Sequence, residues 1–425
     1  MSARAPVRAP ALAAAGVLRA LAGACLLLAG AGSCADGSPS AATPVVPPPI
    51  DTLLGSQRLA ALPPGERGLW TTYMDSSHVR AQRDRALVDA EARAAGLASW
   101  QPAPLGPDFY VTSAMTDAWL AGPDAHRIGE AILSFQTPTG GWSKAVDVTT
   151  RPRRPGEGWS SGANWTWIST FDNGATTEEL RFLGAVVRAQ GDTLQRAGFL
   201  RGLDYIFLAQ FANGCWPQVY PLEGWYHDAV TYNDDATVRI LRLLVAVARG
   251  DYPFVPAAAR ARAGAAVTAG VGCILASQVV VAGKKTVWGA QHDPLTLAPV
   301  QGRAYEPASL CSLESATVVD FLMERPVPGG DVVAAAHAAA AWFRATAIRG
   351  YVYTNGELTA SPGAGPLWAR FSELSSNRPI FGDRDGSVHY ALKGISQERQ
   401  LGYAWYTTSP GSTLQRYDAW APSHP

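Results

Sequence analysis

A short polar segment occurs twice in this chain, each time directly before a helical pattern, and it constrains the fold more than any other feature. The first copy, FDNGAT, starts at Phe171, and the second, YNDDAT, starts at Tyr232. Apolar residues follow both copies at helical spacing. A Q-x-x-x-G-x-W element precedes each copy, at residues 136–142 and 210–216. Two helical units of similar design would place oxygen ligands at equivalent helix starts. The pattern therefore predicts a cation site facing a shared cavity.

Helical periodicity, interrupted by Gly- and Trp-rich loops, begins at about Ala86 and predicts an all-α fold. A weaker third copy of the segment, at 313–317, indicates repeated helical hairpins. Such hairpins stack into an α/α toroid or partial (α/α) barrel with long rim loops. Residues 279–282 and 352–354 are expected to form short hairpin arms. The predicted helices are 126–135, 177–189, 196–211, 237–249, 257–278, 315–323 and 332–347.

The charge balance argues against a strongly charged partner. Lys plus Arg number 35, as do Asp plus Glu. No global field therefore attracts nucleic acid or a membrane surface. We expect no nucleic-acid partner, and we expect a monomer.

The N-terminal residues have the pattern of an export signal, with arginines before an apolar run over 11–31 and small residues after it. A single-pass anchor is the alternative, but Arg19 interrupts the run. Cys34 follows small residues, as at a bacterial lipoprotein cleavage site, although Ala31 stands where Leu is usual. A lipid anchor at Cys34 and a free mature form both stay open, and export (secreted, periplasmic or surface lipoprotein) is expected in either case. The predicted organisation is a signal peptide over 1–34, a Pro/Ala/Ser-rich linker and N-terminal extension over 35–85, and one folded domain over 86–425.

The cysteines form no recognisable framework. Beyond Cys34 only Cys215, Cys273 and Cys311 remain, without repeated spacing. They predict no zinc site and at most one disulfide, whose pairing the sequence leaves open.

The two polar segments supply four candidate metal ligands: Asp172, Asn173, Asp234 and Asp235. Asp and Asn before a helix are ordinary N-caps. The second copy, however, carries more charge than one cap needs, and the first has Asp-Asn at the equivalent place. Hard oxygen ligands without His or Cys favour calcium over a transition metal.

Two further groups of residues have chemical potential. Arg303 lies in a polar and aromatic segment after His292, and in the structural interpretation it pairs with an acid such as Glu306. His292 next to Asp293 is only a weak indication of a base. Arg370, Arg378 and Arg384 lie close together in a segment rich in turn formers, which is typical of anion recognition. The alternative for these arginines is a solvated loop with ion pairs to neighbouring acids.

Together these residues resemble the pectate lyases of polysaccharide lyase family 10, over about 126–406. The resemblance rests on ordered blocks at 140–144, 170–176, 213–218, 220–222, 231–236, 288–293, 303–306 and 377–386. The chain departs from the family pattern at Ser143, Cys215, Gly289 and Cys311-Ser312. None of these departures removes a charged or metal-binding residue, so they affect loop packing rather than chemistry.

The resemblance implies a catalytic pectate lyase domain that cleaves α-1,4-linked polygalacturonate by calcium-assisted anti-β-elimination, giving 4,5-unsaturated oligogalacturonides. It places Arg303 at the Brønsted base. A free guanidinium is not a base at neutral pH, so this role needs a pocket that disfavours its charge. The calcium ligands would be Asp172, Asn173 and Asp234, with Asp235 as an alternate. Substrate would be bound by Lys144, Arg370, Arg384, Arg378 and Tyr305.

Two other functions compete with this interpretation. A glycoside hydrolase on an α/α toroid needs two carboxylates flanking the scissile bond, and Asp172 with Asp234 could form that pair. A non-catalytic pectin-binding surface protein would need no base, so the presence of Arg303 argues against it.

Overall fold

The computed structural model describes residues 53–162 and 164–425. The expected signal peptide, the candidate lipid anchor at Cys34 and the first part of the linker lie outside the described residues. No helix in the described ranges is both long and apolar enough to cross a membrane.

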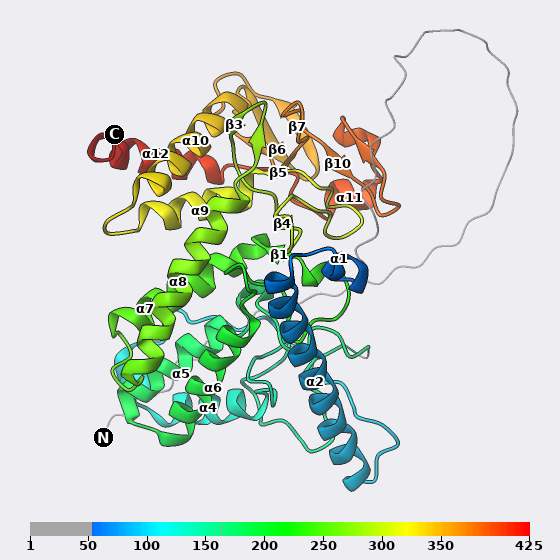
Figure 1. Ribbon diagram of the computed structural model, residues 1–425, viewed down its shortest axis with the longest axis vertical. Helices are drawn as coiled ribbons and strands as arrows, with labels where there is room; N and C mark the ends of the chain where they lie inside the picture. The colour runs from blue at the N-terminus through cyan, green and yellow to red at the C-terminus, as the bar shows by residue number, and fades with distance from the viewer. Residues whose placement is uncertain (1–52, 163) are drawn as a thin grey trace, which may run out of the picture. The chain divides into compact units, whose positions relative to one another are not determined.

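Helices dominate the chain, as predicted (Figure 1). The α-helices are α1 (Ser56–Ala60), α2 (Pro64–Ala94), α3 (Asp117–Leu120), α4 (Pro123–Ser134), α5 (Thr177–Gln190), α6 (Thr193–Ala209), α7 (Ala236–Arg249), α8 (Ala257–Ser277), α9 (Ser312–Met323), α10 (Gly330–Thr346), α11 (Gln397–Leu401) and α12 (Ser409–Trp420). The 3-10 turns are η2 (Asp172–Gly174), η3 (Tyr226–Asp228), η4 (Asn233–Asp235), η5 (Leu392–Gly394) and η6 (Ala421–Ser423).

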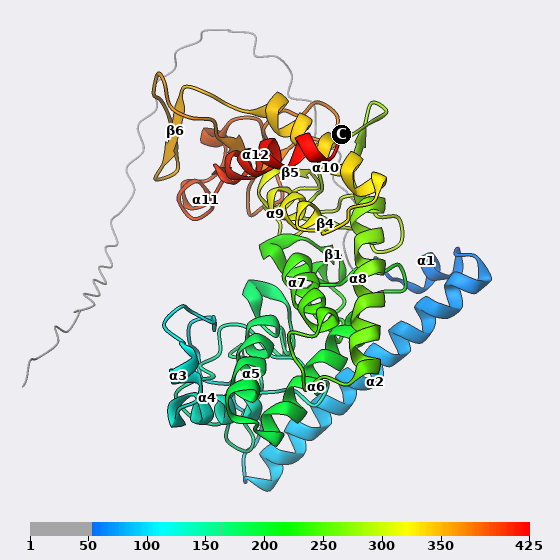
Figure 2. The ribbon, with the colours of Figure 1, turned by 90° about the vertical axis from the view of Figure 1, so that its left-hand side faces the viewer.

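Consecutive helices pack in pairs, α5 with α6, α7 with α8, and α9 with α10 (Figure 2). Helix α12, near the end of the chain, also packs against α9. The first helices of these pairs, α5, α7 and α9, are also neighbours in space. The turns η2 and η4 directly precede α5 and α7 and contact each other. The repeated polar segments are thereby brought together at adjacent helix starts.

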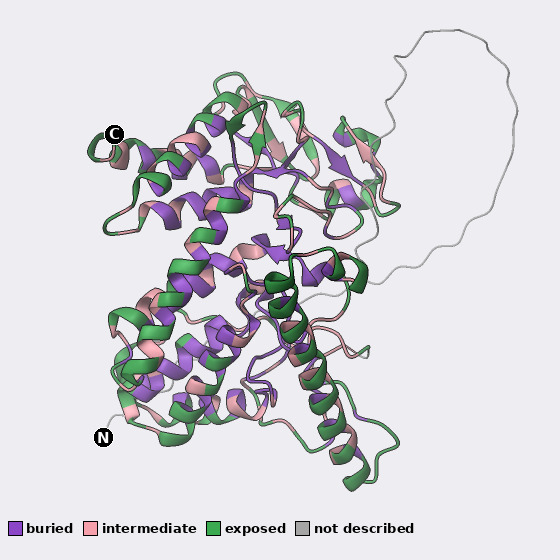
Figure 3. Cartoon of the chain, in the orientation of Figure 1, coloured by how far each residue is buried: buried purple, intermediate pink, exposed green. Residues whose placement is uncertain are grey.

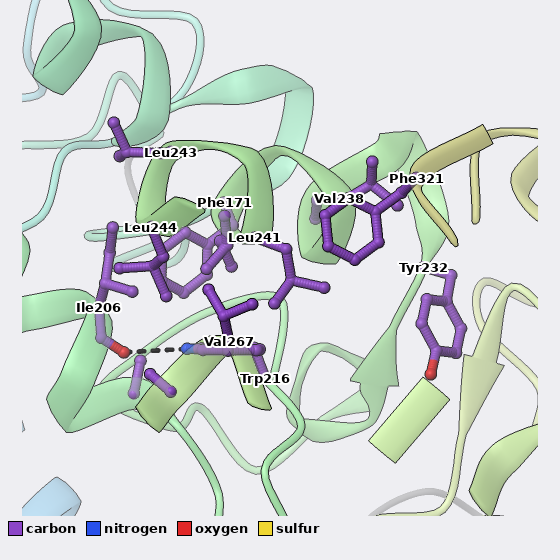
Figure 4. Close-up of a cluster of buried hydrophobic side chains, with 14 of the residues drawn as sticks. Phe171, Ile206, Trp216, Tyr232, Val238, Leu241, Leu243, Leu244, Val267 and Phe321 are labelled. Carbon is purple, nitrogen blue, oxygen red and sulfur yellow. Dashed lines mark hydrogen bonds between the residues drawn. The ribbon is translucent and has the colours of Figure 1, made fainter. Parts of the chain in front are cut away.

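The Q-x-x-x-G-x-W pattern occurs twice in the sequence, but four buried tryptophans make the same kind of hydrogen bond in the structure. Trp216 Nε1 donates to the carbonyl of Ile206 at 2.9 Å, inside a buried cluster that also contains Leu241 and Leu244 (Figure 4). Each of three further buried tryptophans likewise donates to a carbonyl of the helix that precedes it. These bonds are Trp142 to Ile132, Trp288 to Ile274 and Trp368 to Phe343.

Short antiparallel ladders hold the loops that join the helices. β1 (Val230–Thr231) pairs with β4 (Gln291–His292), and β5 (Leu310–Cys311) pairs with β9 (Phe371–Ser372). β8 (Trp368–Ala369) pairs with β12 (Tyr406–Thr407), so Arg370 lies between two paired strands. The remaining pairs are β2 (Val280–Val281) with β3 (Lys284–Lys285), β6 (Tyr351–Thr354) with β7 (Glu357–Ala360), and β10 (Phe381–Gly382) with β11 (Val388–His389).

Helix α2 begins at Pro64, well before the periodicity that the sequence shows from Ala86. Most of its surface is exposed (Figure 3). It is attached along its length, by contacts that include the Trp70 ring 5.2 Å from Phe211, the Tyr73 hydroxyl donating to the Ala209 carbonyl at 3.0 Å and the Thr139 hydroxyl donating to Asp84 Oδ2 at 2.5 Å. A helix with so few buried positions carries little apolar pattern, which explains why the sequence did not reveal it.

One disulfide joins Cys215, in the loop after α6, to Cys273 in α8. Among the cysteines of the described residues, Cys311 is free and buried. The bridge fastens the Trp216 loop to the neighbouring helix pair.

Candidate active site

The turns η2 and η4 share an unusual backbone. Asn173 and Asp234, at equivalent positions, have φ of 51° and 50°, and the next residues, Gly174 and Asp235, have φ of 81° and 60°. Side chains other than glycine rarely adopt this left-handed region, and such conformations persist where the surrounding structure enforces them. The two copies of the polar segment therefore share a left-handed turn as well as their residue types.

A pair of neighbouring carboxylates forms the centre of the site. Asp172 accepts a hydrogen bond from Gln218 Nε2 at 2.7 Å and forms an ion pair with Lys144. The Asp234 carboxyl lies within hydrogen-bonding reach of Asp172. Burial raises the pKa of Asp234, and the charge of Asp172 raises it further. Two acids placed this close favour a shared cation or a shared proton.

The other two candidate ligands point elsewhere. Asn173 Nδ2 donates to Asp108 Oδ2 at 2.9 Å. Asp235 accepts a hydrogen bond from the Thr317 hydroxyl at 2.7 Å and lines a separate polar pocket with Arg239. The amide oxygen of Asn173 stays available as a ligand, whereas Asp235, which was expected only as an alternate ligand, is engaged by Thr317.

A buried arginine continues the network from the carboxylate pair. Arg370 forms an ion pair with Glu314, and both side chains are almost fully buried. Arg370 Nη2 also donates to Asn233 Oδ1 at 3.3 Å, and Asn233 Nδ2 donates to Asp234 Oδ2 at 2.6 Å. Arg370 is thus connected to the carboxylate pair through a single amide.

Arg303 lies at the other end of this network. It forms an ion pair with Glu306, which also accepts a hydrogen bond from the Tyr403 hydroxyl at 2.7 Å. The Tyr403 ring lies between the two arginines, 5.8 Å from Arg303 Cζ and 4.7 Å from Arg370 Cζ. Burial alone would lower the pKa of Arg303, but the hydrogen bond and charge of Glu306 outweigh it and raise that pKa. The predicted pairing of Arg303 with Glu306 is confirmed.

Tyr226 is a buried residue whose hydroxyl is affected by charges from both parts of the site. Burial raises the pKa of its hydroxyl, and the charges of both Arg303 and Asp172 act on the same group. Tyr226 belongs to η3, in the loop that leads into β1. The charge of Arg303 thus lowers the pKa of this hydroxyl and the charge of Asp172 raises it.

The remaining predicted binding residues separate into two places. Arg384 lies at the edge of the site, 5.6 Å from the Tyr305 ring, and pairs with Glu398. Arg378 lies over the exposed Tyr390 ring at 3.8 Å and has no contact with this network among the described residues. The three arginines that are close in sequence thus do not form one anion site.

His292 is a structural residue. It is fully buried, its Nδ1 lies 2.8 Å from the Leu297 carbonyl, and its Nε2 accepts the Gly289 N–H at 3.0 Å. Burial lowers its pKa to about 4. Both ring nitrogens are engaged, so it is not available as a base.

Sequence reasoning did not assign a role to five residues of the network: Gln218, Tyr226, Asn233, Glu314 and Tyr403. Three of them carried a signal. Gln218 ends the second tryptophan block, Asn233 belongs to the second copy of the polar segment, and Glu314 belongs to the third. Tyr226 and Tyr403 carried none, because their places depend on how distant loops meet.

The donor set at the carboxylate pair suits a hard cation. Within the described ranges, no group of three or more His, Cys, Asp or Glu side chains is arranged to hold a metal ion. Asp172 and Asp234 nevertheless place two mutually repelling carboxylates side by side, which a divalent cation would offset. Calcium takes 6–8 oxygen ligands. Further ligands would come from amide or backbone carbonyl oxygens, such as the buried Gln218 Oε1, which has no hydrogen-bond partner among the described residues, and from water or a bound anion.

Comparisons with known proteins decide the family. The sequence profile of the family described as pectic acid lyase matches residues 136–414. The solved structure of a family 10 polysaccharide lyase from Cellvibrio cellulosa is 32% identical, with a TM-score of 0.64 over 73% of this chain and 98% of that one. The chain belongs to polysaccharide lyase family 10.

A second structure of this lyase family is similar to the chain to nearly the same degree. It is a mutant of the Cellvibrio cellulosa enzyme in complex with trigalacturonic acid, with 32% identity and a TM-score of 0.63 over 73% of this chain and 99% of that one. No curated protein matches the chain. The profile spans the carboxylate pair, Arg303 and Arg370, so the whole network lies inside the lyase region.

Proposed function

We propose that the protein is a pectate lyase that cleaves polygalacturonate by anti-β-elimination and leaves a 4,5-unsaturated end. The observation that carries this proposal is the network from the Asp172–Asp234 pair through Arg370 and Tyr403 to Arg303. It combines two neighbouring acids, a buried arginine connected to them, and a second arginine that lies against the same Tyr403 ring as the first. The neighbour in complex with trigalacturonic acid supports a uronate as the ligand.

The chemistry requires removal of a weakly acidic proton. The C5 hydrogen of a galacturonate lies next to a carboxylate, so its removal adds charge to a group that is already negative. Positive groups aimed at that carboxylate stabilise the transition state. Lys144 pairs with Asp172, and Arg370 is connected to Asp234 through Asn233; their ammonium and guanidinium groups suit a carboxylate. A calcium ion bound at Asp172 and Asp234 would supply further charge to the same carboxylate.

Arg303 is the proposed base that accepts the C5 proton. The C4–O4 bond then breaks, and its electron pair leaves with the departing chain. Glu306 opposes this role because it raises the pKa of Arg303. The base is therefore available only to a small extent near neutral pH, and the rate should rise as the solution becomes alkaline.

The geometry argues against a glycoside hydrolase. Hydrolases of that kind hold their two carboxyl groups about 5 Å or more apart, on either side of the scissile bond. Asp172 and Asp234 lie within hydrogen-bonding reach of each other. This pair is better placed to share one cation than to flank a sugar linkage.

Two wider expectations complete the proposal. The helix pairs would form part of an α/α toroid, since α5, α7 and α9 are neighbours and begin beside the site. The substrate is an extracellular polymer too large to cross a membrane, which agrees with the export signal expected from the N-terminal sequence.

The proposal is tested by incubating the full-length protein with polygalacturonate, with added calcium and with a chelator. We expect ultraviolet-absorbing oligogalacturonides, each lighter by one water molecule than the product of hydrolysis, and we expect the chelator to abolish them. Saturated products would instead establish a hydrolase. Undiminished activity in chelator would remove the metal from the mechanism.

A further inference from the structure

Trp167, which the proposed chemistry does not use, lies against the Lys144 side chain. Lys144 Nζ is 3.7 Å from the centroid of the indole ring, and the same ammonium forms the ion pair with Asp172. An ammonium this close to an aromatic face is attracted by the ring quadrupole. Lys144 is therefore held by two groups, one charged and one aromatic.

The backbone of Trp167 indicates that its position is enforced. Its φ of 58° lies in the left-handed region, which a bulky side chain rarely adopts. Its N–H donates to Glu223 Oε1 at 2.5 Å. The buried His227 ring lies 4.0 Å from the indole, and His227 Nδ1 is 3.1 Å from Glu223 Oε2. Strain of this kind persists at sites where a particular arrangement is needed.

We propose that Trp167 is a positioning residue that keeps the Lys144 ammonium in place for a uronate carboxylate, and that Glu223 and His227 hold Trp167. The proposal rests on the proposed function, because it takes a uronate as the ligand. Asp172 would share its charge with a bound cation and would then attract Lys144 less strongly. The indole ring is neutral, so its hold on the ammonium is unchanged. Trp167 thereby keeps the Lys144 ammonium directed at the substrate when a bound cation has weakened the attraction between Asp172 and Lys144.

The same loop offers a matched control. Trp165 also has a left-handed backbone, with φ of 52°, and also lies against a cation, with Arg85 Cζ 4.8 Å from its ring. It packs against Trp100 and Trp159 rather than against Lys144. Removing its ring therefore tests the loop without touching the Lys144 contact.

The experiment compares Trp167→Leu with Trp165→Leu. Two quantities are measured: KM for polygalacturonate with added calcium, and the Kd of trigalacturonate by calorimetry, also with added calcium and in an Arg303→Ala background that prevents turnover. We expect Trp167→Leu to raise both by about three- to thirty-fold, the usual range for a cation over an aromatic ring, with little change in kcat. Trp165→Leu should leave both unchanged. Should Trp167→Leu not fold, Trp167→Phe, which keeps a smaller ring, must still weaken binding relative to Trp165→Phe.

A double-mutant cycle separates positioning from general packing. If Trp167 acts through Lys144, then Trp167→Leu has no further effect on Kd in a Lys144→Ala background. Additive losses, or a Trp167→Leu variant that binds like Trp165→Leu, overturn the positioning role while wild-type activity stands. A wild-type protein that neither binds trigalacturonate nor forms unsaturated product overturns the proposed function, and this inference with it.

Discussion

Replacing Glu306 with Gln isolates the charge that keeps Arg303 protonated. Glu306 is buried, pairs with the Arg303 guanidinium, and accepts the backbone N–H of Arg303 at 2.9 Å and the Tyr403 hydroxyl at 2.7 Å. Gln has nearly the same shape but no charge. The pKa of Arg303, which Glu306 raises, should therefore fall in the variant.

The size of this change follows from the contact. A hydrogen bond to a charged group is worth about 1.5–3 kcal/mol, and one pKa unit corresponds to about 1.4 kcal/mol. The Arg303 side chain is 40% exposed, so solvent screening places the effect at the lower end. We expect the pKa of Arg303 to fall by about one unit.

If Arg303 acts as a base, kcat/KM must rise with pH. Arg303 is protonated at ordinary assay pH, and activity that depends on its neutral form rises with pH. A lower pKa moves this rising limb of kcat/KM to lower pH, by about one unit here, with about tenfold more neutral base at a given pH.

The assay is the pH profile of kcat/KM for the wild type, for Glu306→Gln and for Glu373→Gln. Glu373 is a suitable control because its partners are Ser376 and Tyr390, outside the network. Thermal unfolding establishes that each variant is folded. A rising limb that stays in place, or that moves to higher pH, would refute the role of Arg303 as base.

Three further predictions concern the supports of the site. Arg370→Ala leaves Glu314 buried without its partner and should lower the free energy of unfolding by about 3–5 kcal/mol; a loss below about 1 kcal/mol in urea unfolding would contradict the buried ion pair. Replacing both Cys215 and Cys273 by Ser should lower it by about 4 kcal/mol, from a sequence separation of 58 residues. Reductant should have the same effect on the wild type and none on the double variant. Asp234→Asn removes one charge of the carboxylate pair and should weaken calcium binding in calorimetry, whereas equal affinity would place the ion elsewhere.

Local patterns in the sequence predicted most of the helices. The helix predicted over 257–278 is α8 (Ala257–Ser277), and the one predicted over 177–189 is α5 (Thr177–Gln190). These helices have a buried face and clear ends, such as Gly191 in the left-handed conformation after α5. Helix α2 has only a narrow buried stripe, in which Ser77 and Asp84 are polar, so it left no clear apolar period.

The sequence indicated which residues belong to the site, but not which of them contact each other. The two polar segments match Asp172 with Asn233, and Asn173 with Asp234. In space, however, Asp172 meets Asp234, because η2 and η4 contact each other at adjacent helix starts. Equivalent positions in a repeat therefore have different partners. Asn173 accordingly donates to Asp108, a residue that no pattern in the sequence links to the site.

The three arginines near the C-terminal end likewise show that closeness in sequence does not predict which residues meet in the site. Arg370, Arg378 and Arg384 are close in sequence, yet only Arg370 is buried in the network. Its place is set by the pairing of β9 with β5, which brings it against Glu314 at the start of α9. Contacts between segments so far apart in the chain leave no periodic trace in one sequence.

The most direct test of the account is the turnover of Arg303→Ala and Arg303→Lys on polygalacturonate, with trigalacturonate binding measured on the same variants. If Arg303 takes the proton from the sugar, both variants lose about 10²- to 10⁴-fold in kcat while binding changes little. Turnover close to that of the wild type in either folded variant would contradict the account.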